Sequence, residues 1–253
     1  MKHALLALSA LMGLTAVPAL SHAQSSPLSF NAAVSSDYRY RGISQTRLKP
    51  AFSAGVDYAA ANGFYVGAWG STIKWIKDFG GDADVEIDVY GGYKGQFSKG
   101  LGYDVGLLQY IYPSAQTPTW DAGFEDPNTT ELYGALTFGP VTGKVSYSLS
   151  NLFGNYDFVN GRDTKGSYYL DLSAPFEVGG GFTLTPHIGY QKVKNLDVAS
   201  YSDYAVTLSK DFSGFLLSAS VVGTDADKTF YASPANGKFL GRSGVVLQAK
   251  YSF

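Results

Sequence analysis

Few side chains in this sequence could carry acid–base or nucleophilic chemistry. It contains no cysteine and three histidines, His3, His22 and His187. A serine hydrolase needs a base that takes the serine proton and a third group that orients this base. His187 is the only histidine after residue 23, and no serine near it or elsewhere stands in a special motif. We therefore expect His187 to be a hydrogen-bonded wall residue rather than a catalytic base.

The sequence also contains no motif for binding a metal ion or a phosphate group. One histidine and no cysteine cannot form a usual transition-metal site. Asp78, Asp82 and Asp126 do not follow the spacing of an EF-hand calcium loop. Gly179-Gly180-Gly181 joins two predicted strands, so it predicts a turn and not a phosphate-binding loop. We predict no catalytic residue, no metal site and no cofactor, and the net charge of −2 makes nucleic acid a poor partner.

The charged residues instead alternate with apolar ones. From Val85 to Tyr90 one parity is aliphatic and the other is mostly acidic. From Val245 to Phe253 one parity is Val, Leu, Ala, Tyr and Phe, and the other is Val, Gln, Lys and Ser. Alternation of this length is typical of strands with one apolar and one polar face.

The spacing of these segments predicts the architecture. Twelve segments have strand character: 28–40, 51–60, 64–73, 84–97, 101–112, 129–138, 141–152, 166–178, 182–193, 201–212, 215–226 and 243–253. Connections of two or three residues with turn chemistry alternate strictly with longer loops. This rhythm is typical of an all-β, up-and-down antiparallel transmembrane barrel with short periplasmic turns. An even strand count places both termini on the periplasmic side.

The N-terminus predicts export. Met1-Lys2-His3 is basic, residues 4–20 form an apolar run, and Ser21-His22-Ala23 offers small residues for cleavage. We expect residues 1–23 to be a signal peptide and residues 24–253 to be one outer-membrane barrel domain; a retained N-terminal anchor is the alternative. No later stretch approaches the roughly 20 apolar residues of a transmembrane helix.

A soluble β-sandwich or lipocalin-like barrel would show the same alternation. Three features favour the membrane: the signal peptide, the alternating loop lengths, and aromatic residues near strand ends, such as Tyr38 with Tyr40 and Tyr110 with Tyr112. The 19 tyrosines and 16 phenylalanines also suit interface girdles. We therefore place the protein in the bacterial outer membrane.

Several sequence blocks resemble the TorF family of porins. The first is Ser35-Ser36-Asp37-Tyr38-Arg39-Tyr40-Arg41-Gly42-Ile43-Ser44-Gln45-Thr46, and shorter blocks follow in order at 63–71, 88–93, 130–133 and 201–204. The resemblance covers essentially the whole mature chain. It implies an outer-membrane β-barrel that forms a pore, and it brings no solute and no binding residues with it.

If the aliphatic parity faces lipid, the polar parity faces the barrel interior. The candidate pore-lining residues are Asp37, Arg39, Arg41, Asp57, Asp84, Glu86, Asp88, Lys94, Asp104, Glu131, Lys144, Asp171, His187 and Lys250. With Asp203 and Asp211 the interior would hold ten acidic and five basic groups, a net charge of about −5, which predicts a weak cation preference. The alternative is a structural network of paired charges, and for Asp37, Arg39 and Arg41 both interpretations stand.

Three function classes follow. The leading hypothesis is a passive channel for small hydrophilic solutes or ions; the others are a closed structural or surface-recognition barrel and a lipid-active enzyme. Twelve strands lie between the filled eight-stranded barrels and the open barrels of sixteen or more. Loop 113–128 is long enough to fold inward as a constriction, although its length alone favours an exposed loop.

The expected partners follow from the location. They are outer-membrane lipids, small hydrophilic solutes, and the barrel assembly machinery, which would recognise the final strand through its outward Val245, Leu247, Tyr251 and Phe253. The sequence carries no signature of the transported solute or of the oligomeric state.

Overall fold

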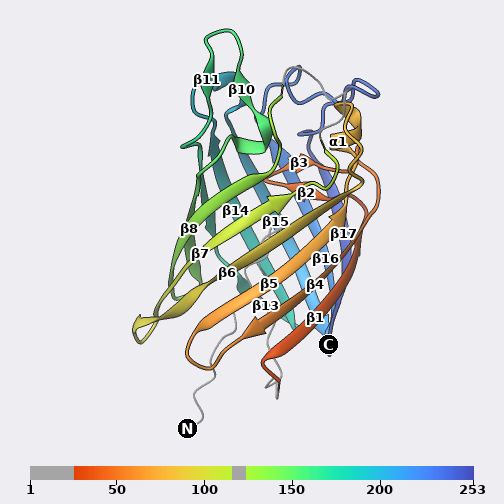
Figure 1. The fold of residues 1–253 in the computed structure, drawn as a ribbon. Coiled ribbons are helices and arrows are strands. Elements are labelled where there is room, and N and C mark those ends of the chain that lie inside the picture. The colour runs from red at the N-terminus through yellow and green to blue at the C-terminus, as the bar shows by residue number, and fades with distance from the viewer. Residues whose placement is uncertain (1–25, 116–123) are drawn as a thin grey trace.

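The computed structural model describes residues 26–115 and 124–253, and nearly all of its strands belong to one closed sheet (Figure 1). The sheet closes because β12 pairs with both β9 and β14. β12 and β13 are two parts of one passage through the wall, so twelve passages form a closed antiparallel barrel, as the sequence predicted. The predicted signal peptide lies outside the described residues.

The elements follow the chain in simple order. The wall consists of β1 (Leu28–Ser35), β4 (Ala51–Ala59), β5 (Phe64–Thr72), β6 (Val85–Ser98), β7 (Leu101–Ile111), β8 (Thr129–Phe138), β9 (Val141–Ser148), β12 (Tyr168–Ser173), β13 (Phe176–Gly179), β14 (Phe182–Lys192), β15 (Tyr201–Phe212), β16 (Phe215–Thr224) and β17 (Gly244–Ser252). The loops hold β2 (Arg39–Tyr40), β3 (Ile43–Ser44), α1 (Trp75–Asp78), η1 (Leu152–Gly154), β10 (Tyr156–Asp157), β11 (Arg162–Asp163) and η2 (Asp197–Ala199). None of the described helices has the length and apolar character needed to span a membrane.

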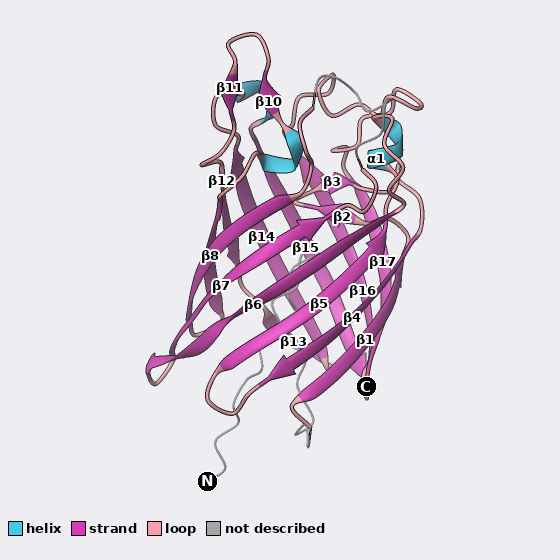
Figure 2. Cartoon of the chain, in the orientation of Figure 1, coloured by secondary structure: helices cyan, strands magenta, loops and turns pink. Residues whose placement is uncertain are grey.

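The first predicted strand, 28–40, is too long. β1 ends at Ser35, and after it the chain leaves the wall and forms the separate hairpin of β2 and β3 within the outline of the barrel (Figure 2). The backbone N–H of Ser36 still donates to the carbonyl of Leu247 on β17 (2.8 Å). Beyond it, the Asp37 carboxylate accepts a hydrogen bond from the Ser44 hydroxyl, and the Thr46 hydroxyl accepts the backbone N–H of Tyr38. These local hydrogen bonds favour a turn in the chain instead of a longer strand.

The eighth predicted strand, 166–178, is divided into β12 and β13. Ala174 and Pro175 separate the two parts, and Pro175 has no N–H to donate to a ladder. β12 pairs on both sides, with β9 and β14, whereas β13 pairs with β14 alone. The other predicted wall strands differ from the observed ones only at their ends, by at most four residues.

The outer face of the barrel is apolar. Leu107 lies opposite Leu132, and Leu132 lies opposite Tyr147, so the three side chains form a row across β7, β8 and β9. All three are about half exposed although they are apolar. Inward-facing neighbours on the same strands, such as Tyr110 and Glu131, are buried. A protein with this inside-out pattern is solvated by lipid, not by water.

The ends of the chain close the wall. β1 pairs with β17, and Phe30 and Phe253 exchange backbone hydrogen bonds of 2.9 and 3.0 Å. Their rings stack with centroids 5.8 Å apart. Phe253 therefore completes the seam, and the start of β1 and the C-terminus lie at the same end of the barrel (Figure 1).

The apolar belt predicts a depth-dependent cost of charge. Leu107→Arg, near the middle of β7, is expected to lower the free energy of unfolding by about 2–4 kcal/mol, because the guanidinium would enter hydrocarbon. Val85→Arg, at the first residue of β6, is the matched control and should cost about 0–1 kcal/mol. The measurement is urea unfolding of protein folded into lipid vesicles. Equal costs at the two positions would contradict the assignment of the belt.

Candidate functional site: the barrel lumen

The β2–β3 hairpin leaves the wall after β1 and enters the lumen, where its tip contacts β8, β14, β15 and β16. Its turn is Arg41-Gly42, and both residues have positive φ, 45° and 80°, as in the tight turns that suit hairpins. A Cβ atom on Gly42 would lie 2.4 Å from Cγ2 of Thr224 and 2.9 Å from Cβ of Asp203. Only glycine combines this φ with this close approach, so the hairpin tip abuts β15 and β16.

Arg41 fixes the tip of the hairpin between three other wall strands. Its Nη2 donates to both carboxylate oxygens of Glu131 on β8, at 2.7 and 2.9 Å. Its Nη1 donates to Oε1 of Gln191 on β14 (2.5 Å). The guanidinium also lies over the rings of Tyr40 and Tyr169, 4.7 and 4.3 Å from their centroids. A positive φ is uncommon for arginine, and these contacts hold the residue in it.

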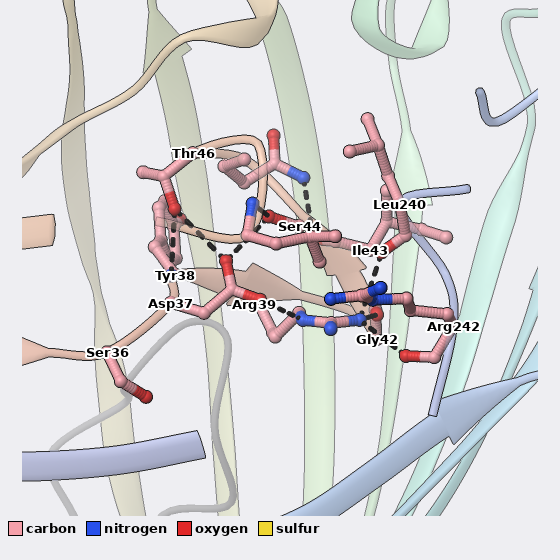
Figure 3. A network of polar contacts seen from close by, with 12 residues as sticks. Ser36, Asp37, Tyr38, Arg39, Gly42, Ile43, Ser44, Thr46, Leu240 and Arg242 are labelled. Atoms are coloured by element: carbon pink, nitrogen blue, oxygen red, sulfur yellow. Dashed lines mark hydrogen bonds and ion pairs between the residues drawn. The ribbon is translucent and has the colours of Figure 1, made fainter. Parts of the chain in front are cut away.

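The root of the hairpin is fixed by the Asp37–Arg39 pair (Figure 3). Arg39 Nε lies 2.5 Å from Asp37 Oδ2, and Oδ1 of Asp37 accepts from the Ser44 hydroxyl at 2.6 Å. Arg39 Nη1 donates to the carbonyls of Gly42 (2.8 Å), Leu240 (2.9 Å) and Arg242 (3.1 Å). Asp37 and Arg39 thus bind the hairpin to itself and to the loop before β17. For these two residues the structure places the side chains in a paired network.

Tyrosine hydroxyls accompany most of the interior carboxylates. Tyr38 and Tyr112 both donate to Glu86, at 2.5 and 2.8 Å. The same pairing recurs as Tyr90 to Asp57 (2.5 Å), Tyr65 to Asp104 (2.6 Å), Tyr110 to Glu131 (3.2 Å) and Tyr169 to Asp203 (2.9 Å). A hydroxyl that donates to a buried carboxylate offsets part of its desolvation cost without adding a charge.

The sequence analysis did not predict that tyrosines would be the partners of the interior carboxylates. The signal was present in β6, where Tyr90 has the same parity as Glu86 and Asp88. The sequence analysis assigned tyrosines to the membrane interface. It therefore did not consider them as hydrogen-bond donors to interior carboxylates.

Asp88 is the exception among these carboxylates. It is fully buried, and neither of its Oδ atoms has a hydrogen-bond partner among the described protein groups. It lies on β6 opposite Trp69 and Tyr110, and Glu86 precedes it on the same inward face.

His187 is a wall residue of the lumen. Its Nε2 lies 2.7 Å from Asp171 Oδ2 and 3.3 Å from the Tyr169 hydroxyl, and its Nδ1 lies 3.5 Å from Asp203 Oδ1. Among the described residues, these contacts hold the imidazole between two carboxylates and no serine hydroxyl is bonded to it. His187 is thus a hydrogen-bonded residue of the wall, with one carboxylate on each side of its ring.

The predicted interior lysines lie nearer to the short turns. Lys144 Nζ lies 4.3 Å from the centroid of the Tyr133 ring, and Lys94 Nζ lies 5.4 Å from that of Tyr65. Lys94 also lies opposite Asp104 in the ladder. Lys250 is on the inward parity of β17, in register with Ala33. The structure therefore gathers these lysines with Asp57 and Asp104 below the hairpin.

Asp84 does not belong to this interior set. It precedes β6 at the rim, is about half exposed, and its Oδ1 and Oδ2 lie 2.7 Å from Nζ of Lys74 and of Lys77. Asp211 keeps the inward parity of β15 and accepts the backbone N–H of Gly214 at the end with the short turns. Without Asp84 the predicted interior set holds nine acidic and five basic groups, a net charge of −4 rather than −5.

The comparisons with known proteins address the family. The model of the Gcw_chp family, described as a bacterial protein of unknown function, matches residues 21–253. The chain belongs to this family. No curated protein matches this Gcw_chp member.

Solved structures share the fold of this Gcw_chp chain. The KdgM porin aligns with a TM-score of 0.53 at 10% identity, over 89% of this chain and 98% of that one. The KdgM porin in complex with disordered oligogalacturonate gives 0.54 at 11%, with the same coverage. The NanC porin gives 0.52 at 12%, again over 89% and 98%. At such identities the likeness concerns the fold, which is that of an outer-membrane porin-type barrel.

The hairpin anchor predicts a local effect. Glu131→Gln leaves the buried Arg41 without its ionic partner, a loss of about 3–5 kcal/mol for buried pairs. We expect the backbone amides of residues 39–44 to exchange with deuterium at least about tenfold faster in micelles. Asp104→Asn, which removes an interior carboxylate that accepts from Tyr65, is the matched control. Unchanged protection in Glu131→Gln, or an equal increase in the control, would contradict the anchoring role.

Proposed function

We propose that this Gcw_chp chain is an outer-membrane channel for passive passage of small hydrophilic solutes or ions. The observation that carries the proposal is the polarity of the interior: nine acidic and five basic residues occupy the inward parity of a barrel whose outer face is apolar. A charged interior is typical of barrels that conduct in water. The porin fold and the resemblance to the TorF family of porins support the same function.

The proposed constriction is the β2–β3 hairpin. It fills the role that the sequence suggested for loop 113–128, of which residues 116–123 lie outside the described residues. Arg41 at its tip bonds to Glu131 and Gln191 on two different wall strands. The proposed constriction then lies in the half of the barrel nearer the long loops, above Lys94, Lys144 and Lys250.

The proposed orientation follows the usual asymmetry of such barrels. The short turns and the C-terminus lie at one end, and α1, β10 and β11 lie at the other (Figure 1). Short turns face the periplasm in outer-membrane barrels. We place both mature termini there, after export with a signal peptide cleaved behind Ala23. The assembly machinery would engage β17 and the residue after it, where Val245, Leu247, Tyr251 and Phe253 are exposed.

A closed surface-recognition barrel is the second candidate. Two observations favour it: Glu86, Asp88 and Glu131 are at most 2% exposed beneath the hairpin, and the β10–β11 hairpin presents Phe158 and Val159 at 48% and 93% exposure. Apolar side chains at a protruding tip suit contact with a partner. A lipid-active enzyme has less support, because His187 is held by two carboxylates.

Conductance separates the two candidates. Arg41→Ala removes the contacts that hold the hairpin tip, so we expect a larger single-channel conductance in planar bilayers than for the wild type. Lys250→Ala removes an interior charge away from the hairpin and should change the conductance much less. A barrel that conducts neither as wild type nor as Arg41→Ala would contradict the channel and favour the closed alternative.

The net interior charge predicts a weak cation preference. In a salt gradient the reversal potential of the wild type should therefore have the cation-selective sign. Asp57→Asn and Asp104→Asn each remove a partly exposed interior carboxylate. Each should move the reversal potential toward the value of an anion-selective channel. Asp84→Asn at the rim, whose charge two lysines already balance, is the control and should move it less. Clear anion selectivity of the wild type would contradict the prediction.

A further inference from the structure

A basic pocket lies at the rim with the long loops, above β4 and β5. It has a volume of about 280 Å³, and its lining includes Arg47, Lys49 and Lys74 together with Thr46, Thr72 and Asn236. None of the described lining residues carries a carboxylate. The lining thus presents three positive charges and several hydrogen-bonding groups, a composition that suits a phosphate group.

The loop that carries two of these charges is held in a costly conformation. Arg47 and Leu48 both have positive φ, 56° and 62°. The Thr46 hydroxyl donates to the carbonyl of Lys49 (2.6 Å), and the Leu48 N–H donates to the Ser44 hydroxyl (2.8 Å). Consecutive non-glycine residues in this region cost on the order of 1–3 kcal/mol each, and such strain concentrates at binding sites.

Two carboxylates pair with cations of the pocket without lining it. Arg47 pairs with Asp78, which is almost fully buried and also accepts the Ser233 hydroxyl (2.8 Å). Lys74 donates to Asp84 (2.7 Å), and this hydrogen bond lowers the pKa of that carboxyl. Among the described residues the Lys49 ammonium has no ion-pair or hydrogen-bond partner. Two cations are thereby oriented by ion pairs, and one positive charge is left in excess.

The pocket is continuous with the lipid-facing wall. The Thr72 hydroxyl, on the outward parity of β5, accepts the N–H of Phe52 (3.1 Å), and the Phe52 side chain is 67% exposed on the outer face. Val34 lies opposite Phe52 and Val85 lies opposite Thr72, and both are exposed. A ligand with its anionic group in the pocket would therefore lay an apolar tail along this wall. A free anion would use only the pocket.

With the loop end taken as the outer face, we infer that this pocket binds a phosphate group of an outer-leaflet lipid. The site fixes the height of the barrel in the membrane. The cations of the pocket lie where a lipid headgroup would be, and the apolar row lies below them where its acyl chain would be. Basic pockets at membrane surfaces recognise lipid headgroups in this way.

The test uses the refolded mature chain in micelles and three probes: lipopolysaccharide, the same material without its phosphates, and inorganic phosphate. We expect the phosphorylated lipid to bind most tightly. Lys49→Gln and Lys74→Gln should each weaken its binding about fivefold, since a lysine near a lipid phosphate contributes roughly 1 kcal/mol. Lys228→Gln removes an exposed lysine that does not line the pocket and is the matched control, with unchanged binding.

Three results would overturn the inference. Equal affinity for the phosphate-free lipid would show that the phosphate is not recognised. Equal weakening by Lys228→Gln would reduce the effect to overall charge. Inorganic phosphate that binds as tightly as the lipid would identify a site for free anions instead. Channel conductance is measured separately, so a failure here leaves the proposed function untouched.

Discussion

The constraint on which the structure depends is that lipid cannot hydrogen-bond to a backbone. Every N–H and C=O at membrane depth needs a partner within the protein, so the sheet must close, and β1 and β17 meet for this reason. Closure leaves one face in hydrocarbon, which accepts only apolar side chains. The charged side chains are consequently gathered inside, where Glu131, Asp203 and their neighbours then need partners of their own.

Those partners come from two sources. The wall supplies tyrosine hydroxyls, which suit carboxylates without cancelling their charge, as with Tyr90 and Asp57. The inward hairpin supplies Arg39 and Arg41, which pair with Asp37 and Glu131. A buried pair stabilises a structure only weakly, but removal of one partner is costly. The paired charges therefore fix the positions of the interior side chains more than they stabilise the fold.

The wall was predictable from sequence because each strand obeys a local rule. Two-residue periodicity and turn residues located twelve strands, and the outward parity of β17 follows the predicted one. The hairpin was not predictable in this way, because alternation in residues 35–40 continues although the chain has left the wall. Its position depends on contacts with Glu131, Gln191 and Leu240, which are 90 to 201 residues distant in sequence. Ser35 to Thr46, the first of the blocks on which we based a family resemblance, contains this hairpin.

The distance in sequence between the hairpin and its contacts sets an order of events during assembly. The hairpin follows the first wall strand, yet its tip rests on Asp203 and Thr224, and its root bonds to the carbonyls of Leu240 and Arg242. These surfaces exist only after the last strands have joined the sheet. Contacts between residues so far apart form late, because the chain between them must first be ordered. The hairpin can be seated only in a barrel whose final strands are in register, so its seating is a check on completed folding.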